Sequence, residues 1–143
     1  MADWRSELDG LLRQKQSQRE EQAKGDDATR FMSGTAVPAL EDLRAELEKH
    51  GREVTIRASG SSVALFVSRG GEEELMYRIQ FRSYPDRVLP YVEIRGRERK
   101  GLKLVSTDSM FRSGKPDYRL SDITREEIIK HFLDHYRRRV HSA

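Results

Sequence analysis

The stretch that decides the fold is residues 75–82, LMYRIQFR. Every second side chain from Leu75 to Phe81 is apolar or aromatic, and the intervening positions include Arg78, Gln80 and Arg82. A period of two is typical of a β-strand with one face on a core and the other in water. Residues 75–82 therefore predict a strand whose arginines face outward.

Further strands are predicted on both sides of this stretch. Residues 52–58 alternate, residues 62–69 (SVALFVSR) are β-rich throughout, and residues 87–95 continue the pattern. Short turns separate them at residues 59–61, 70–71 and 84–86, so consecutive strands are expected to pair antiparallel. Residues 96–101 are predicted as a charged loop, residues 102–104 as a short fifth strand, and residues 106–117 as loop.

Helices are predicted before and after the strands. A helical region covers about 27–50, either starting anew at an N-cap on Thr35 or running as one long helix kinked at Pro38. Near the other end, Thr124 and Glu127 have the spacing of a reciprocal capping box. The expected buried stripe of that last helix is Ile128, Ile129, Phe132, Leu133, Tyr136 and Val140.

The predicted fold class is α+β with two layers: a four- or five-stranded antiparallel meander sheet packed against N-terminal and C-terminal helices. Helices 39–50 and 124–140 would cover one face of the sheet. The opposite face would show Thr55, Arg57, Arg78, Gln80, Arg82, Glu93 and Arg95. Residues 1–26 are expected to form a partly mobile helical arm, and residues 27–143 a single domain.

The predicted arm carries a short apolar stripe. Its members recur at helical spacing and would form a partner-helix face: Trp4, Leu8, Leu11 and Leu12. Residues 13–24 add almost no apolar side chain, and residues 25–27 (GDD) are predicted to interrupt the helix. The stripe either pairs with another helix or belongs to a frayed arm that docks by its first turns.

Composition excludes several classes of protein. The 143 residues include no cysteine, which rules out a disulfide framework, a thiolate zinc site and a cysteine nucleophile. No apolar run approaches the ~20 residues that cross a bilayer, and the first residues lack a secretory signal. We therefore expect a cytoplasmic protein that does not insert into a membrane.

No catalytic, cofactor or metal residue is predicted. The sequence from His131 to His135 (HFLDH) lacks the glutamate of a metalloprotease helix, and both histidines are expected on an exposed polar face. Nucleophile-elbow and phosphate-loop motifs are absent. The protein is therefore more simply a binding protein than an enzyme.

Charge is concentrated in the predicted sheet. Residues 52–115 contain 13 Lys and Arg against 8 Asp and Glu, whereas the whole chain has a net charge of +3. The candidate anion or nucleic-acid face consists of Arg57, Arg78, Arg82, Tyr91, Arg95, Arg97, Arg99, Lys100 and Lys103. Guanidinium groups pair with phosphates and a ring can stack on bases, although the RNA-binding aromatic motif is missing.

The leading hypothesis is a non-enzymatic protein-interaction module, with a possible homodimer, acting through the arm or the polar sheet face. A protein partner or self-association is favoured over nucleic acid. The alternative is RNA or single-stranded DNA binding through the arginine-rich face. The third possibility is a small-molecule pocket or an enzyme site between the sheet and the helices.

Overall fold

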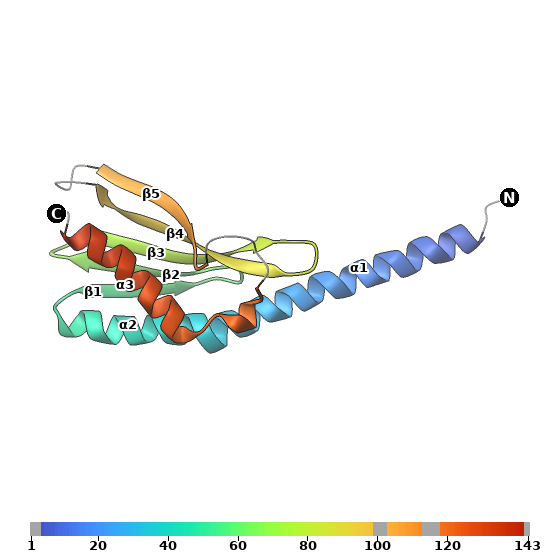
Figure 1. Cartoon of the computed structure of the whole chain (residues 1–143), viewed down its shortest axis with the longest axis horizontal. Coiled ribbons are helices and arrows are strands. Elements are labelled where there is room, and N and C mark those ends of the chain that lie inside the picture. The colour runs from blue at the N-terminus through green and yellow to red at the C-terminus, as the bar shows by residue number, and fades with distance from the viewer. Residues whose placement is uncertain (1–3, 99–102, 113–117, 142–143) are drawn as a thin grey trace.

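The structure is a computed structural model that describes residues 4–98, 103–112 and 118–141. In chain order the helical elements are α1 (Trp4–Phe31), the π-helical segment η1 (Met32–Ala36), α2 (Val37–Lys49), the 3-10 turn η3 (Leu120–Asp122) and α3 (Arg125–His141). The strands are β1 (Glu53–Ala58), β2 (Val63–Arg69), β3 (Glu72–Ser83), β4 (Val88–Glu98) and β5 (Lys103–Met110). Helices α2 and α3 pack on the sheet, and α1 projects away from it (Figure 1).

The five strands form one antiparallel sheet in the order β1-β2-β3-β4-β5, which confirms the predicted α+β meander. Residues 75–82 lie in the central strand β3. There Tyr77 is paired with Leu65 of β2 and with Ile94 of β4. Because directly opposed residues share a face of the sheet, the apolar positions of the three strands form one continuous layer.

The last strand is longer than the sequence predicts. Strand β5 runs to Met110 instead of ending near Leu104, and β4 continues to Glu98 into the segment predicted as a loop. The sequence of β5, KLVSTDSM, is mostly polar because this is an edge strand with little core contact. Strand β5 is defined by its backbone pairing with β4, which runs from Tyr91 opposite Met110 to Glu98 opposite Lys103.

The turn between β2 and β3 needs glycine at both positions. Gly70 and Gly71 have φ angles of 60° and 81°, in the left-handed region that costs a side-chain-bearing residue about 1–2 kcal/mol. Replacing Gly71 with alanine is expected to lower the free energy of unfolding by about 1 kcal/mol. Chemical denaturation measures the change.

Gly60, in the turn between β1 and β2, is the matched control. A Cβ there would meet open space, and its φ lies outside the left-handed region. Gly60→Ala should therefore change the stability by less than about 0.5 kcal/mol. Equal effects at Gly60 and Gly71 would contradict the turn geometry.

The junction between α1 and α2 differs from the predicted helix start at Thr35. The chain stays helical through one π turn, in which the N–H of Val37 bonds to the carbonyl of Met32. Pro38 lies in the first turn of α2, and its ring would collide with the carbonyl four residues back in a regular helix. The wider π turn relieves this conflict, so the alternative of one continuous helix is closer to the structure.

Helix α1 runs unbroken to Phe31, so the predicted interruption at residues 25–27 is wrong. A glycine inside a helix costs only about 1 kcal/mol, and the Thr29 hydroxyl bonds back to the Gly25 carbonyl at 2.9 Å. All side chains of residues 4–23 are exposed, and packing begins with Lys24 and the buried Phe31. The division into an arm (1–26) and a domain (27–143) stays a prediction.

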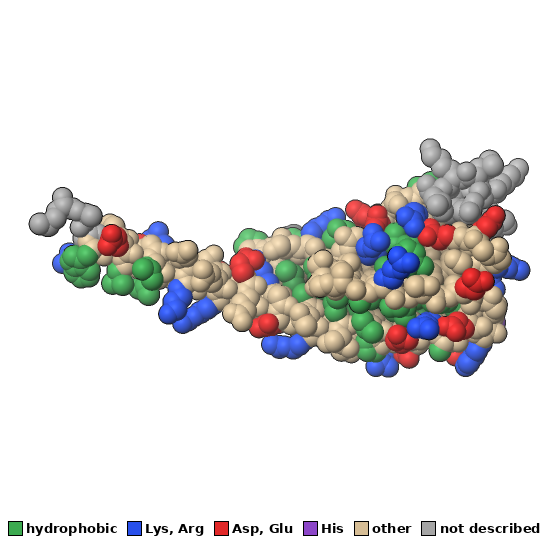
Figure 2. Space-filling view, turned by 180° about the vertical axis from the view of Figure 1, so that it is seen from behind, with side chains coloured by type: hydrophobic (Ala, Val, Ile, Leu, Met, Phe, Trp, Pro, Cys, Tyr) green, Lys and Arg blue, Asp and Glu red, His purple; other side chains and the backbone are tan. Residues whose placement is uncertain are grey.

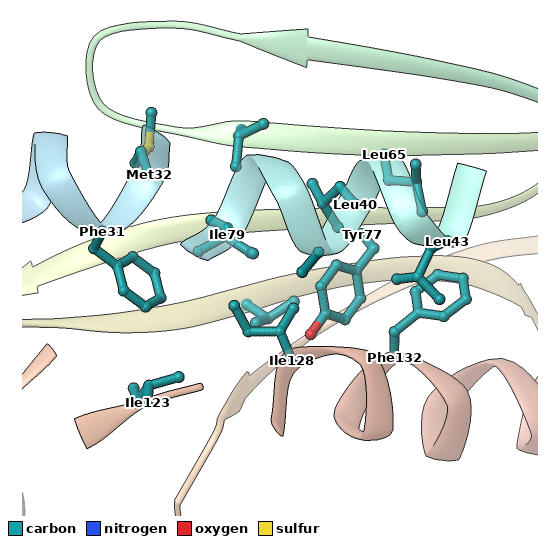
Figure 3. Close-up of a cluster of buried hydrophobic side chains, with 14 of the residues drawn as sticks. Phe31, Met32, Leu40, Leu43, Leu65, Tyr77, Ile79, Ile123, Ile128 and Phe132 are labelled. Atoms are coloured by element: carbon teal, nitrogen blue, oxygen red, sulfur yellow. The ribbon is translucent and has the colours of Figure 1, made fainter. Parts of the chain in front are cut away.

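The core lies between the sheet and the two packed helices. Tyr77 of β3 points from the sheet toward α3, with Leu40 and Leu43 of α2 and Ile128 and Phe132 of α3 around it (Figure 3). All five side chains are buried. The Tyr77 and Phe132 rings meet edge to face, with centroids 5.3 Å apart, an arrangement that aromatic pairs favour.

The start of α3 confirms half of the predicted capping box. The N–H of Glu127 donates to Thr124 Oγ1 at 3.1 Å, as expected. The Glu127 carboxylate, however, accepts hydrogen bonds from Arg112 at 3.0 and 3.1 Å. Glu127 thus joins α3 to the segment that follows β5.

The buried stripe of α3 is narrower than predicted. Ile128 and Phe132 are fully buried, but Leu133 is 45% exposed. Leu133 lies about 100° around the helix from Phe132, which turns it away from the sheet. One helix on one sheet buries only the narrow arc that faces the strands.

Candidate functional site

Four of the predicted arginines and Tyr91 lie on the sheet face opposite α2 and α3, which we call the open face. One row of directly opposed residues crosses all five strands: Arg57, Ala64, Arg78, Glu93 and Asp108. Arg82 is four residues along β3 from this row, while Tyr91 and Arg95 are two residues along β4. An even spacing keeps these side chains on the same face.

Carboxylates accompany most of these arginines. Arg78 pairs with Glu93 at 3.0 Å, and Arg95 makes a two-bond pair with Glu73 at 2.7 and 2.8 Å. The nearest guanidinium and carboxylate atoms of Arg82 and Asp108 are 4.0 Å apart. Aromatic rings provide further contacts: Arg57 lies over Phe66, and Arg82 also lies over Tyr91.

The open face is therefore a charge-paired surface. The hydrogen bond to Glu73 raises the pKa of Arg95 above its ordinary value, so the Arg95 guanidinium stays charged. On the side of the molecule that Figure 2 shows, basic and acidic side chains are interspersed over hydrophobic ones. A phosphate would have to displace carboxylates from Arg78 and Arg95, which weakens the case for nucleic-acid binding.

The side chains of the remaining basic candidates lie outside the described part of the structure. Arg99 and Lys100 lie outside the described residues. Arg97 and Lys103 belong to β4 and β5, but their side chains fall outside the described part of the structure. The predicted basic cluster next to the open face stays a prediction.

The predicted partner-helix face lies near the start of α1, at the end far from the sheet (Figure 1). Its members are exposed: Trp4 by 64%, Leu8 by 49%, Leu11 by 62% and Leu12 by 56%. Their spacing places them along one side of the helix. We call this set the α1 stripe.

The expectation that His131 and His135 are exposed is wrong, because both side chains are partly buried. His131 points from α3 toward the sheet, where its Nδ1 is 2.7 Å from the Tyr77 hydroxyl and its Nε2 is 3.0 Å from the Ser109 hydroxyl. The rings of Phe111 and His135 pack against it at 4.8 and 4.6 Å. Burial first, and the charge of His135 next, lower the pKa of His131 to about 4.

The hydrogen bonds define what His131 can do. Burial raises the pKa of Tyr77 well above its usual range, so the phenol stays protonated. Among the described residues, Nδ1 is the only hydrogen-bond acceptor that the Tyr77 hydroxyl reaches, which favours the tautomer in which the phenol O–H donates to Nδ1. Nε2 then carries the ring proton and donates to Ser109. A serine nucleophile needs a histidine nitrogen that accepts its proton, so this arrangement joins α3 to β3 and β5 without activating Ser109.

Sequence reasoning missed a cleft of about 490 Å³ where the end of α1, the turn between β3 and β4, and η3 meet. Three arginines line it, Arg30, Arg87 and Arg119, each from a different part of the sequence. In the sequence, the only feature that pointed to this cleft was the general excess of arginine. No motif predicts which arginines lie together in the folded chain. The alternative of a small-molecule pocket or an enzyme site between the sheet and the helices stays a prediction.

Within the described ranges, no group of three or more His, Cys, Asp or Glu could hold a metal ion. None of the described helices has the length and apolar character needed to span a bilayer. No family model, no curated protein and no solved structure matches this chain.

Proposed function

We propose that this chain is a protein-interaction module that docks through the α1 stripe, and that the occupant is the same stripe of a second copy. The observation that carries the proposal is exposure. In the part of the chain that the structure describes, five large hydrophobic side chains are exposed, and all but Leu133 belong to the α1 stripe. A contiguous exposed apolar surface is typical of an interaction site.

A second copy fits because the stripe is complementary to itself in an antiparallel pair. In an antiparallel pair, residue numbers rise along one helix as they fall along the other. When Leu8 of each copy lies opposite Leu11 of the other, Trp4 therefore lies opposite Lys15. The Lys15 stem can cover the indole ring and its ammonium can lie on the ring face. Leu133 is the only other exposed large hydrophobic side chain among the described residues.

The length of α1 leaves room for this pairing. Its 28 residues span about 42 Å, and the helix projects beyond the sheet (Figure 1). Two copies joined at their stripes would keep their sheets apart. Burial of the eight stripe side chains has to offset the association cost of about 4–15 kcal/mol. We therefore expect a weak dimer, with a Kd on the order of micromolar.

The open face is not the docking element of this proposal. Three of its four arginines, Arg78, Arg82 and Arg95, already pair with carboxylates. An interface formed there would have to desolvate these ion pairs, and desolvation offsets much of what they contribute. Nucleic-acid binding at the open face stays a prediction with less support.

Sedimentation velocity over a range of concentrations tests the pairing. The wild-type chain should pass from monomer to dimer, and Trp4, its single tryptophan, should shift its fluorescence to shorter wavelength as it becomes buried. The double variant Leu8→Glu/Leu11→Glu should stay monomeric, because burying four like charges in one dimer interface is strongly unfavourable.

The matched control is Ser6→Glu/Ser17→Glu. It adds the same charge to α1, but on the side of the helix away from the stripe. This variant should dimerise like the wild type. A wild-type chain that remains monomeric at about 200 μM, well above a micromolar Kd, would overturn the proposal, and so would equal behaviour of the two double variants.

A further inference from the structure

The cleft beside the end of α1 has an apolar floor and a charged rim. Phe31, Leu120 and Ile123 are at most 7% exposed and form part of its floor. The full lining is Asp27, Arg30, Phe31, Thr35, Asp86, Arg87, Val88, Arg119, Leu120, Ser121 and Ile123. A cleft of about 490 Å³ is within the ~300–1,000 Å³ of small-molecule sites.

The arginines of the cleft differ in what they contact. Arg87 is held in place, because it donates to both oxygens of Asp86 at 3.2 and 2.8 Å and to the Tyr118 carbonyl at 3.0 Å. Arg30 is exposed, and its guanidinium makes no hydrogen bond or ion pair with a described residue. The third, Arg119, is exposed as well.

The pKa of Asp86 is affected by two arginines of the cleft, Arg87 and Arg119. The hydrogen bonds from Arg87 lower the pKa of Asp86 below its ordinary value, and the charge of Arg119 lowers it further. Arg119 is therefore near enough to act on the same space as Arg87. Arg30 approaches that space from α1, on the same helix as Asp27.

We propose that this cleft binds a small organic anion, with a single carboxylate or phosphate group held by Arg30 and Arg119 and an apolar body resting on Phe31, Leu120 and Ile123. The planar guanidinium fork matches the two oxygens of a carboxylate or phosphate. The buried floor gives an apolar body a surface that water solvates poorly.

Charge balance sets the charge of the ligand. Arg87 and Asp86 neutralise each other through their paired hydrogen bonds. Arg30 and Arg119 then share the cleft with one carboxylate, Asp27, which leaves one positive charge. A carboxylate makes the site neutral, and a phosphate monoester, with a charge of about −1.5 to −2 at pH 7, makes it slightly negative. This inference does not depend on pairing through the α1 stripe, because the two surfaces share no residue.

Isothermal titration calorimetry with four probes tests the ligand class. Benzoate and phenyl phosphate carry both the anion and the apolar body, inorganic phosphate lacks the body, and benzyl alcohol lacks the charge. We expect saturable binding of benzoate or phenyl phosphate at least tenfold tighter than that of inorganic phosphate or benzyl alcohol. Which of the two binds more tightly distinguishes a carboxylate site from a phosphate site.

Variants locate the binding. Arg30→Gln/Arg119→Gln should weaken it at least tenfold, because each removes a charge-assisted pair. Arg19→Gln/Arg137→Gln removes the same charge outside the cleft lining and should change the affinity less than twofold. Asp27→Asn removes the competing carboxylate and should tighten binding, a gain that a damaged fold cannot produce.

The proposal is overturned if the wild-type chain shows no saturable binding of benzoate or phenyl phosphate up to about 10 mM, a concentration at which even a millimolar Kd would give nearly full occupancy. Equal effects of the cleft and control variants would also overturn it. Monomer–dimer sedimentation of the same samples keeps the result separate from that of the α1 stripe.

Discussion

Replacing Phe132 with alanine is expected to lower the free energy of unfolding by about 3–5 kcal/mol. The Phe132 ring is fully buried, meets Tyr77 edge to face and stacks on Tyr136 with centroids 5.4 Å apart. Its removal would leave a cavity between α3 and the central strand that the surrounding side chains fill only in part. Urea denaturation followed by circular dichroism measures the loss.

The neighbouring residue provides the control. Leu133 is 45% exposed, so Leu133→Ala should change the stability by less than about 0.5 kcal/mol. Both substitutions shorten a hydrophobic side chain of α3. The Phe132 side chain points into the core, whereas the Leu133 side chain points toward solvent. Similar losses at the two positions, or a loss below about 1 kcal/mol at Phe132, would contradict this packing of α3.

The predictable part of the fold is the part with strict periodicity. Alternation in residues 75–82 places Tyr77 in the core, and the turn residues between strands predict an antiparallel meander. Where burial is one-sided and shallow, the pattern fades. Strand β5 is longer than predicted, because an edge strand of mostly polar residues shows little apolar alternation. Leu133 is exposed although it was predicted to be buried, because its side of α3 does not face the sheet.

Helix continuity is hard to predict for a different reason. Gly25 and Pro38 both weaken a helix locally, and the sequence alone shows only that weakness. The structure absorbs each one, through the Thr29 hydroxyl near Gly25 and through the π turn before Pro38. Packing of Phe31 against Phe81 adds a tertiary contact that local propensity does not contain.

The candidate sites are predictable only where they follow from one element. The α1 stripe is visible in the sequence because its residues share one helix. The open face follows from strand alternation, but the pairing of Arg95 with Glu73 does not, because β2 and β3 shift register between Val67 and Ser68. The cleft unites Arg30, Arg87 and Arg119 through tertiary structure, which no local pattern encodes.

Lowering the pH from 7 to 4 is expected to destabilise the fold by about 2 kcal/mol through His131. Burial lowers the pKa of this imidazole from 6.5 to about 4 in the folded chain. The unfolded chain therefore binds a proton that the folded chain excludes. The cost to stability is small above pH 6.5, grows as the pH drops from 6.5 toward 4, and changes little below that.

The surroundings of His131 explain why the proton is excluded. His135 and Arg138 disfavour a charged imidazole, whereas Asp134 and Glu127 favour it but do not offset burial. Protonation would also place a hydrogen on Nδ1, so the Tyr77 hydroxyl could no longer donate there. The buried phenol would lose the acceptor on which its hydrogen bond depends.

The double variant Tyr77→Phe/His131→Phe separates this effect from other acid effects. It removes the imidazole without leaving the phenol unpartnered, so most of the stability loss between pH 6.5 and 4 should disappear. Burial lowers the pKa of His135 as well, and that smaller slope should persist. Tyr77→Phe alone keeps the buried imidazole of His131 and should keep most of the slope, because burial is the main cause of its lowered pKa. Urea denaturation across this pH range, with proton NMR titration of the histidine resonances, measures both. A wild-type slope in the double variant would assign the acid sensitivity to groups other than His131.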